Sequence, residues 1–144
     1  KTARTDESFA QRSLIRALMD KGNHKDALAM LRQLRLGDPS DPDTLADLGW
    51  AEWRTKGLAG KNPEESEEYL RLALTFNPTH RRAMEYFASI AMDMGQVEEA
   101  KIRLNRSLEA DSGANWARQA IRDLDNPEVD TGKGGRFWRK GRGA

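Results

Sequence analysis

The chain has no cysteine among its 144 residues. Disulfides, thiolate metal sites and thiol nucleophiles are therefore excluded, and because the composition fits a reducing compartment we expect a cytoplasmic protein. No apolar run is long enough to cross a bilayer. The sequence opens with KTARTDES, which has neither a starting Met nor the apolar core of a signal peptide. We therefore expect a fragment or a processed product.

Acidic residues are absent from residues 131–144, although the whole chain has a formal net charge of only +1. The basic residues of this glycine-rich segment are Lys133, Arg136, Arg139, Lys140 and Arg142. The other 130 residues carry 19 basic and 23 acidic groups, a net charge of −4. The chain thus divides into a mildly acidic body and a strongly basic tail.

The body contains an internal repeat, within a length that suits one ordinary domain. Similar residues recur after 39 and then 34 positions, in the series Ala27, Ser66, Ala100; Leu31, Leu70, Leu104; and Pro39, Pro78, Ser112. The series Leu14, Leu48, Phe87 has the same two intervals in the opposite order. Both orders fit a 34-residue period with one five-residue insertion between Gly49 and Ser66, which we place within residues 55–66.

With this period the chain resembles the tetratricopeptide repeat (TPR) family, whose pattern is W-x2-L-G-x2-Y, then A-x3-F, then P, on two antiparallel helices. The matching positions are Gln11, Leu14, Ile15, Leu18, Ala27, Leu31 and Pro39; then Leu45, Leu48, Gly49, Glu52, Ser66, Leu70 and Pro78; then Met84, Phe87, Ala88, Ala91, Ala100, Leu104 and Ser112. The polar Gln11 and Glu52, and Ser112 in place of proline, depart from the pattern. The resemblance covers about residues 8–125 and implies an all-α, right-handed α-solenoid.

The resemblance implies a repeat domain over residues 1–125 and a separate tail at 126–144. The repeats are expected near 8–41, 42–80 and 81–114, followed by a capping helix at 114–125. Helices are predicted, within a few residues, at 7–20, 24–36, 42–55, 63–76, 80–94, 97–110 and 114–125. Local signals agree, because Gly22 and Gly95 fall at expected turns, and Asp41-Pro42 and Asn62-Pro63 are typical of helix starts.

Candidates for catalysis or metal binding are few. His24 and His80 fall at expected turns without a partner at metal-ligand spacing, so we interpret them as solvated turn residues. Pairs of neighbouring acids lie in first turns of helices, where carboxylates favour the helix dipole: Glu64-Glu65, Glu67-Glu68 and Glu98-Glu99. The GKGG stretch at 132–135 lacks the lysine–hydroxyl pair of a phosphate loop. We expect no catalytic residue, no metal site, no cofactor and no enzymatic activity.

The resemblance also implies a binding surface, because the first helix of each pair lines a concave groove in TPR solenoids. The groove positions are Phe9, Arg12, Arg16, Asp43, Asp47, Trp50, Trp53, Arg54, Arg82, Glu85, Ser89, Met92 and Trp116. The three tryptophans belong either to the groove or to the core, since helical phase is uncertain by about one residue. The family's best-known site grips a C-terminal carboxylate with lysine and asparagine, whereas this chain offers Arg16, Trp50 and Ser89 there. We do not expect that chemistry.

Acids and indoles in one groove suit arginine and aromatic side chains. The tail supplies such a ligand in Arg136, Phe137, Trp138, Arg139 and Lys140. We expect a peptide- or protein-binding adaptor whose tail docks in cis, as autoinhibition, or in trans, as homo-oligomeric self-association. Two alternatives remain: the tail is a flexible end, or it binds single-stranded nucleic acid or an anionic membrane. The nucleic-acid and membrane alternative ranks second, because an acidic body repels phosphate.

Overall fold

The computed structural model describes residues 6–56 and 62–126. Over these ranges the chain is helical and contains no strand, as predicted. The helices are α1 (Asp6–Asp20), α2 (His24–Gly37), α3 (Pro42–Thr55), α4 (Glu64–Phe76), α5 (Arg81–Asp93), α6 (Val97–Ala110) and α7 (Asn115–Asp125). Each end lies within one residue of its predicted position. The tail at 127–144, and residues 57–61 of the predicted insertion, lie outside the described residues.

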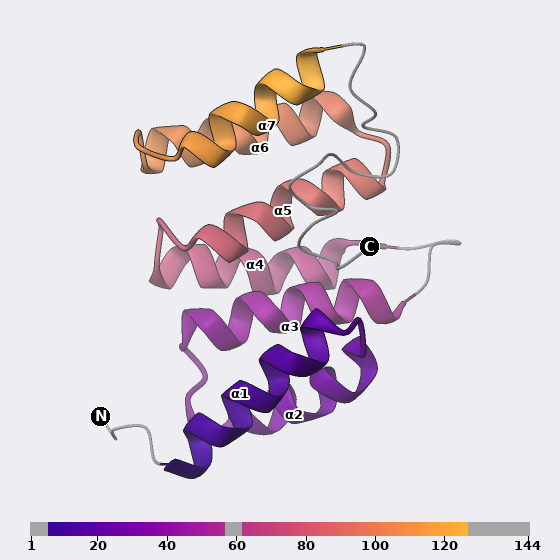
Figure 1. Cartoon of the computed structure of the whole chain (residues 1–144), viewed down its shortest axis with the longest axis vertical. Coiled ribbons are helices and arrows are strands. Elements are labelled where there is room, and N and C mark those ends of the chain that lie inside the picture. Colours follow the sequence, from indigo (N-terminus) through magenta and orange to yellow (C-terminus); the bar gives the residue numbers. More distant parts are fainter. Residues whose placement is uncertain (1–5, 57–61, 127–144) are drawn as a thin grey trace.

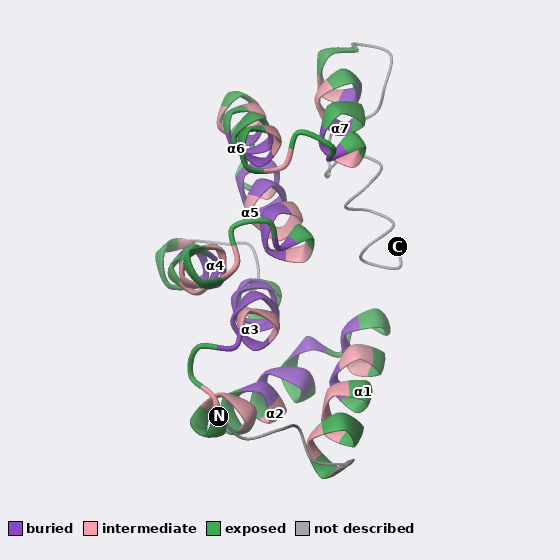
Figure 2. Ribbon diagram, turned by 90° about the vertical axis from the view of Figure 1, so that its left-hand side faces the viewer, coloured by how far each residue is buried: buried purple, intermediate pink, exposed green. Residues whose placement is uncertain are grey.

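Successive helices pack side by side and stack along one long axis, from α1 and α2 at one end to α7 at the other (Figure 1). Seen from the side, α1 and α7 project in the same direction from the two ends of the stack (Figure 2). Helices α3 and α5 are set back between them, and α4 and α6 lie on the opposite side. The stack therefore has an inner face, formed by α1, α3, α5 and α7, and an outer face on which α4 and α6 lie.

Helix α3 is the centre of the core. It packs against α2, α4 and α5, and every residue from Thr44 to Trp53 is buried. A helix that is buried all round has no polar face to give to water, so its polar residues need partners inside the protein. This requirement applies to Asp47 and Glu52, which are both buried.

A second, smaller core joins the last helices. Ala88 of α5 and Leu104 of α6 pack there with Ala114, Ala117 and Ala120. Small side chains let α7 approach α6 closely, and the half-buried Ile121 and Leu124 complete the contact. Helix α7 thus covers apolar surface of the last pair.

The helix starts follow the predicted capping chemistry with two additions, Asn23 at α2 and a histidine at α5. The Asp41 carboxylate accepts a hydrogen bond from the Thr44 N–H at 3.3 Å, and Asn62 accepts one from the Glu64 N–H at 2.9 Å. At α5 the cap is a histidine: His80 Nδ1 accepts from the Ala83 N–H at 3.1 Å. Such acceptors satisfy N–H groups that the first helical turn leaves unpaired.

The interpretation of the two histidines as solvated turn residues is wrong. His24 and His80 are only 7% and 8% exposed, because each lies where a helix begins against the core. The glycine prediction is confirmed: Gly22 and Gly95 have φ of +83° and +76°, a backbone region that favours glycine. They reverse the chain between α1 and α2 and between α5 and α6.

Gly49 marks the closest approach of α3 to α4, at the glycine position of the repeat pattern. A Cβ at this residue would lie 2.8 Å from the Ser66 carbonyl oxygen and 2.8 Å from Leu70 Cγ. We predict that Gly49→Ala lowers the free energy of unfolding by about 1–3 kcal/mol in urea denaturation, because the helices must separate. Gly37→Ala is the control, since nothing lies within 4 Å of that Cβ. Equal stability of the two variants would contradict this packing.

Candidate functional site

The inner face contains a pocket of about 160 Å³ between α1, α2, α3 and α5. Among the predicted groove residues, those lining it are Phe9, Arg12, Arg16, Asp43, Asp47 and Arg82. Ile15, Leu31 and Leu34 contribute apolar lining. The structure therefore brings these six predicted residues, from three helices, to one place.

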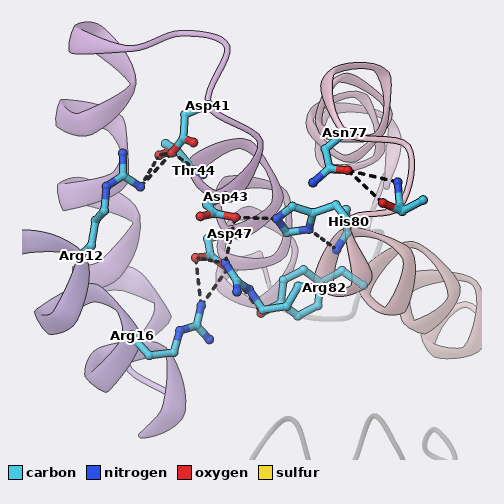
Figure 3. A network of polar contacts seen from close by, with 12 residues as sticks. Arg12, Arg16, Asp41, Asp43, Thr44, Asp47, Asn77, His80 and Arg82 are labelled. Carbon is cyan, nitrogen blue, oxygen red and sulfur yellow. Dashed lines mark hydrogen bonds and ion pairs between the residues drawn. The ribbon is translucent and has the colours of Figure 1, made fainter. Parts of the chain in front are cut away.

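Asp47 of α3 lies at the centre of this group (Figure 3). It is 6% exposed, and Arg16 Nη2 of α1 lies 2.9 Å from both of its carboxylate oxygens. From α5, Arg82 approaches the same oxygens with Nε and Nη2 at 3.4 Å each, and the Tyr86 hydroxyl lies 3.4 Å from Oδ1. Charge-assisted bonds of this kind compensate the cost of burying a carboxylate. One side chain of α3 thus joins α1 to α5.

Tyr86 acts in this group as a neutral donor. Burial raises the pKa of its hydroxyl, and the nearby Asp47 carboxylate raises it further, while Arg16 and Arg82 oppose the shift. The proton therefore stays on the Tyr86 oxygen across the physiological range and is available to Asp47.

Two further carboxylates on α3 and its cap have cationic or imidazole partners. Arg12 Nη1 lies 2.8 Å from Asp41 Oδ2. His80 Nε2 lies 2.7 Å from Asp43 Oδ1. Because His80 Nδ1 already accepts from a backbone N–H, Nε2 carries the proton of the neutral ring and donates to Asp43. Asp43 keeps 44% of its side chain exposed, so it is the carboxylate of this group most open to a ligand.

Aromatic rings continue the inner face toward α7. Trp50 stacks on Tyr86 with ring centroids 4.9 Å apart and planes 3° from parallel. The Arg54 guanidinium lies 5.8 Å from the Trp50 ring, and that of Arg81 lies 5.3 Å from the half-buried ring of Trp116. Guanidinium groups over indole faces are favourable cation–π contacts. Contacts between arginine and aromatic side chains thus already occur within the chain at this face.

Glu85 of α5 completes the set of acids. Its carboxylate accepts a bond from Arg81 Nε at 3.0 Å. Burial raises the pKa of Glu85, and Arg81 and Arg82 act in the opposite direction. Asp43, Asp47 and Glu85 were expected to attract a basic ligand directly, but each has a partner within the chain. A ligand cation must share these carboxylates with those partners.

Several predicted groove residues lie beneath the surface. Trp53 is 0% exposed, and its indole N–H donates to Asp93 at 2.8 Å. Ser89 donates to the Glu85 carbonyl oxygen at 2.7 Å, and Met92 packs in the core with Ala91 and Ala100. Of the open alternatives for the tryptophans, burial in the core describes both Trp53 and Trp50, which is 3% exposed, whereas Trp116 is half-buried. At the rim, by contrast, Phe9 is 69% exposed.

The sequence reasoning missed Tyr86, Arg81 and the role of His80. Tyr86 follows Arg82 by four positions and therefore shares its helix face, a signal that was present in the sequence. The capping role of His80 had no such signal, because histidine is not a preferred N-cap residue. The tail ligand residues, from Arg136 to Lys140, lie outside the described part of the chain.

Among residues 6–56 and 62–126, no cluster of three or more potential metal-ligating side chains is present. No helix within the same ranges is long and apolar enough to cross a membrane.

No protein-family model matches the chain, and neither does any curated protein. Among solved structures it is similar to the first TPR domain of Spaghetti (RPAP3), bound to the HSP90 peptide SRMEEVD. The TM-score is 0.65 at 19% sequence identity, and the alignment covers 85% of this chain and 96% of the other. The chain therefore has a TPR-like helical fold, as the repeat pattern indicates.

The Asp47 group generates a stability prediction. Asp47→Asn keeps the side-chain volume but removes the charge that Arg16 and Arg82 share, so we expect the free energy of unfolding to fall by about 1–3 kcal/mol. The matched control is Asp20→Asn. Asp20 also pairs with Arg16, but it is exposed, and its carboxylate comes no nearer than 3.7 Å to the guanidinium. That variant is expected to stay within about 0.5 kcal/mol of the parent. If urea denaturation gives the same value for both variants, Asp47 does not hold these helices together.

Proposed function

We propose that the protein is a non-enzymatic adaptor that binds an extended peptide on its inner face, and that its own tail, residues 132–144, is one such ligand. The observation that supports this most directly is that the Asp43 carboxylate of α3 and the Tyr86 and Trp116 rings of α5 and α7 keep part of their surface exposed along the inner face. The tail has the complementary composition, five basic residues and the pair Phe137 and Trp138 with no acid.

The recognition chemistry follows from groups on that face. The exposed part of the Asp43 carboxylate offers a charge-assisted bond to an arginine of the ligand. The Trp116 ring offers partly exposed aromatic surface to Phe137 or Trp138. Aromatic anchors supply most of the energy of such interfaces, whereas exposed ion pairs contribute about 1 kcal/mol or less each. We therefore propose that the two tail rings supply most of the binding energy and that the tail arginines orient the tail on the inner face.

The similar TPR domain supports peptide binding as a class of function, because that domain is bound to a peptide. Its peptide, SRMEEVD, is acidic, whereas the ligand proposed for this chain is basic. This difference fits the chain's own residues, since no asparagine stands with Arg16 at the positions of the carboxylate site. The partner class is thus a basic, aromatic segment of a protein.

The proposal allows docking within one molecule or between two. Arg136 lies ten positions after Asn126, the last described residue, and a chain of that length spans about 30 Å when extended. The distance permits docking in cis, and exchange between two molecules uses the same contacts at little added cost. Autoinhibition and self-association are the two corresponding outcomes.

A peptide titration tests the proposal. The receptor is the full chain with Phe137→Ala and Trp138→Ala, whose tail has lost its anchors, and the ligand is a synthetic peptide of residues 132–144. We expect saturable binding by isothermal titration calorimetry, and binding at least about tenfold weaker when the peptide itself lacks the two rings. Trp116→Ala in the receptor should also weaken binding. Phe76→Ala is its control, because Phe76 is an exposed aromatic residue of α4.

Sedimentation of the parent chain distinguishes the two geometries. A concentration-dependent dimer that the double-alanine variant loses indicates exchange between molecules, and a monomer at all concentrations indicates docking in cis. If the peptide does not bind, but the parent chain binds single-stranded RNA or anionic vesicles tightly, the tail acts on phosphate and the inner face is not its receptor.

A further inference from the structure

Outside the inner face, a pocket of about 490 Å³ lies between α4, α5 and α6. Most of its lining residues belong to α4 and α6, the helices that lie on the side of the stack away from α1 and α7 (Figure 2). Its volume is within the range of small-molecule sites. None of its lining residues belongs to the groove predicted from the sequence.

Apolar side chains form much of the pocket wall. They are Leu74, Pro78, Met84, Phe87 and Ala110. Two guanidinium groups lie near Phe87, that of Arg103 at 3.9 Å and that of Arg71 at 5.5 Å from its ring centroid. The half-buried ring offers its remaining surface to a second flat apolar group.

Arg103 is held in the wall of the pocket by three bonds to neighbouring groups. It is 8% exposed, and its nitrogens lie 2.7 Å from the Glu67 carboxylate, 3.0 Å from the Glu99 carboxylate and 2.8 Å from the Phe87 carbonyl oxygen. The charge of Arg103 is therefore fully compensated within the chain. Glu67, interpreted from the sequence as a helix-dipole acid, is in fact buried and joins α4 to α6.

The other two lining arginines are available to a ligand. Arg71 is about half exposed, and its partners Glu67 and Glu68 lie 3.4 Å and 4.0 Å away within its own helix. The pair with Glu68 is exposed and contributes only a few tenths of a kcal/mol. The buried Glu67 keeps its 2.7 Å bond to Arg103 when Arg71 turns away, so a ligand can compete for Arg71. Arg106 is exposed and makes no ion pair or hydrogen bond with any other described residue.

We propose that this pocket binds a small aromatic carboxylate: a flat apolar body against Phe87, Met84 and Leu74, with its anionic group on Arg106 and Arg71. The three lining guanidiniums face one lining carboxylate, Glu99, which is already bonded to Arg103. A cationic ligand is thus disfavoured, and a neutral one leaves the guanidinium of Arg106 unused. This site is independent of the peptide-binding function proposed for the inner face.

The test uses 2-naphthoate as the probe, titrated onto the full chain and followed by two-dimensional NMR. We expect saturable shifts of the Leu74, Met84 and Ala110 resonances. 2-Naphthalenemethanol, which has the same ring without the charge, should bind about tenfold more weakly, and 2-naphthylmethylammonium should not bind measurably. Acetate, which lacks the ring, should produce no saturable shifts.

Two variants locate the site. Arg106→Ala should weaken 2-naphthoate binding about tenfold, whereas Arg122→Ala, which removes an exposed arginine of α7 outside the pocket, should leave it unchanged. Ala110→Leu fills the pocket from the exposed end of α6 and should abolish binding without unfolding the protein. The proposal is overturned if the naphthoate does not saturate, if alcohol and carboxylate bind equally, or if both pocket variants bind like the parent.

Discussion

The buried carboxylate of Asp47 is the interaction on which the inner face depends. Helix α1 packs against α2, and the bonds of Arg16 and Arg12 to Asp47 and Asp41 tie it to α3. Arg82 and Tyr86 add α5 to the same carboxylate. A buried carboxylate without such partners would cost several kcal/mol, so the helices that supply the partners must keep their places. The inner face is therefore one connected surface contributed by three successive helix pairs.

An ion pair of the same kind, between an arginine and a buried carboxylate, joins two helices on the other side of the stack. Arg103 of α6 bonds to Glu67 of α4, as Arg16 of α1 bonds to Asp47 of α3. In each case a helix is joined to its equivalent in a neighbouring repeat through an ion pair whose carboxylate is buried. Apolar burial stabilises the stack. The ion pairs fix the positions of the helices relative to one another, because a displaced helix would leave a buried carboxylate without its partner. Two chemically different surfaces result: an inner face with acids and indoles, and an outer pocket with guanidiniums and a phenyl ring.

The repeat period was sufficient to predict the helices, because apolar spacing, capping residues and turn glycines are local signals that act within one turn or one loop. The polar network was not predictable in the same way. Asp47 is 31 residues from Arg16 and 35 from Arg82, and Trp53 is 40 from Asp93. Separations near the repeat length show that these are contacts between equivalent helices, but which pairs meet depends on how far each helix is rotated about its axis. The side chain of Trp53 lies in the core for the same reason.

The proposed docking of the chain's own tail on the inner face that Asp47 holds together can be tested with a spin label. Because the chain has no cysteine, Gly143→Cys carries a single nitroxide label at a defined place. If the tail docks there, amide resonances around Asp43, Trp50 and Tyr86 are paramagnetically broadened, and resonances around Arg106 on α6 are unaffected. Mixing labelled, unenriched protein with unlabelled, isotope-enriched protein then separates docking in trans from docking in cis. Broadening confined to the outer face, or absent from all helices, would show that the tail does not dock on the inner face.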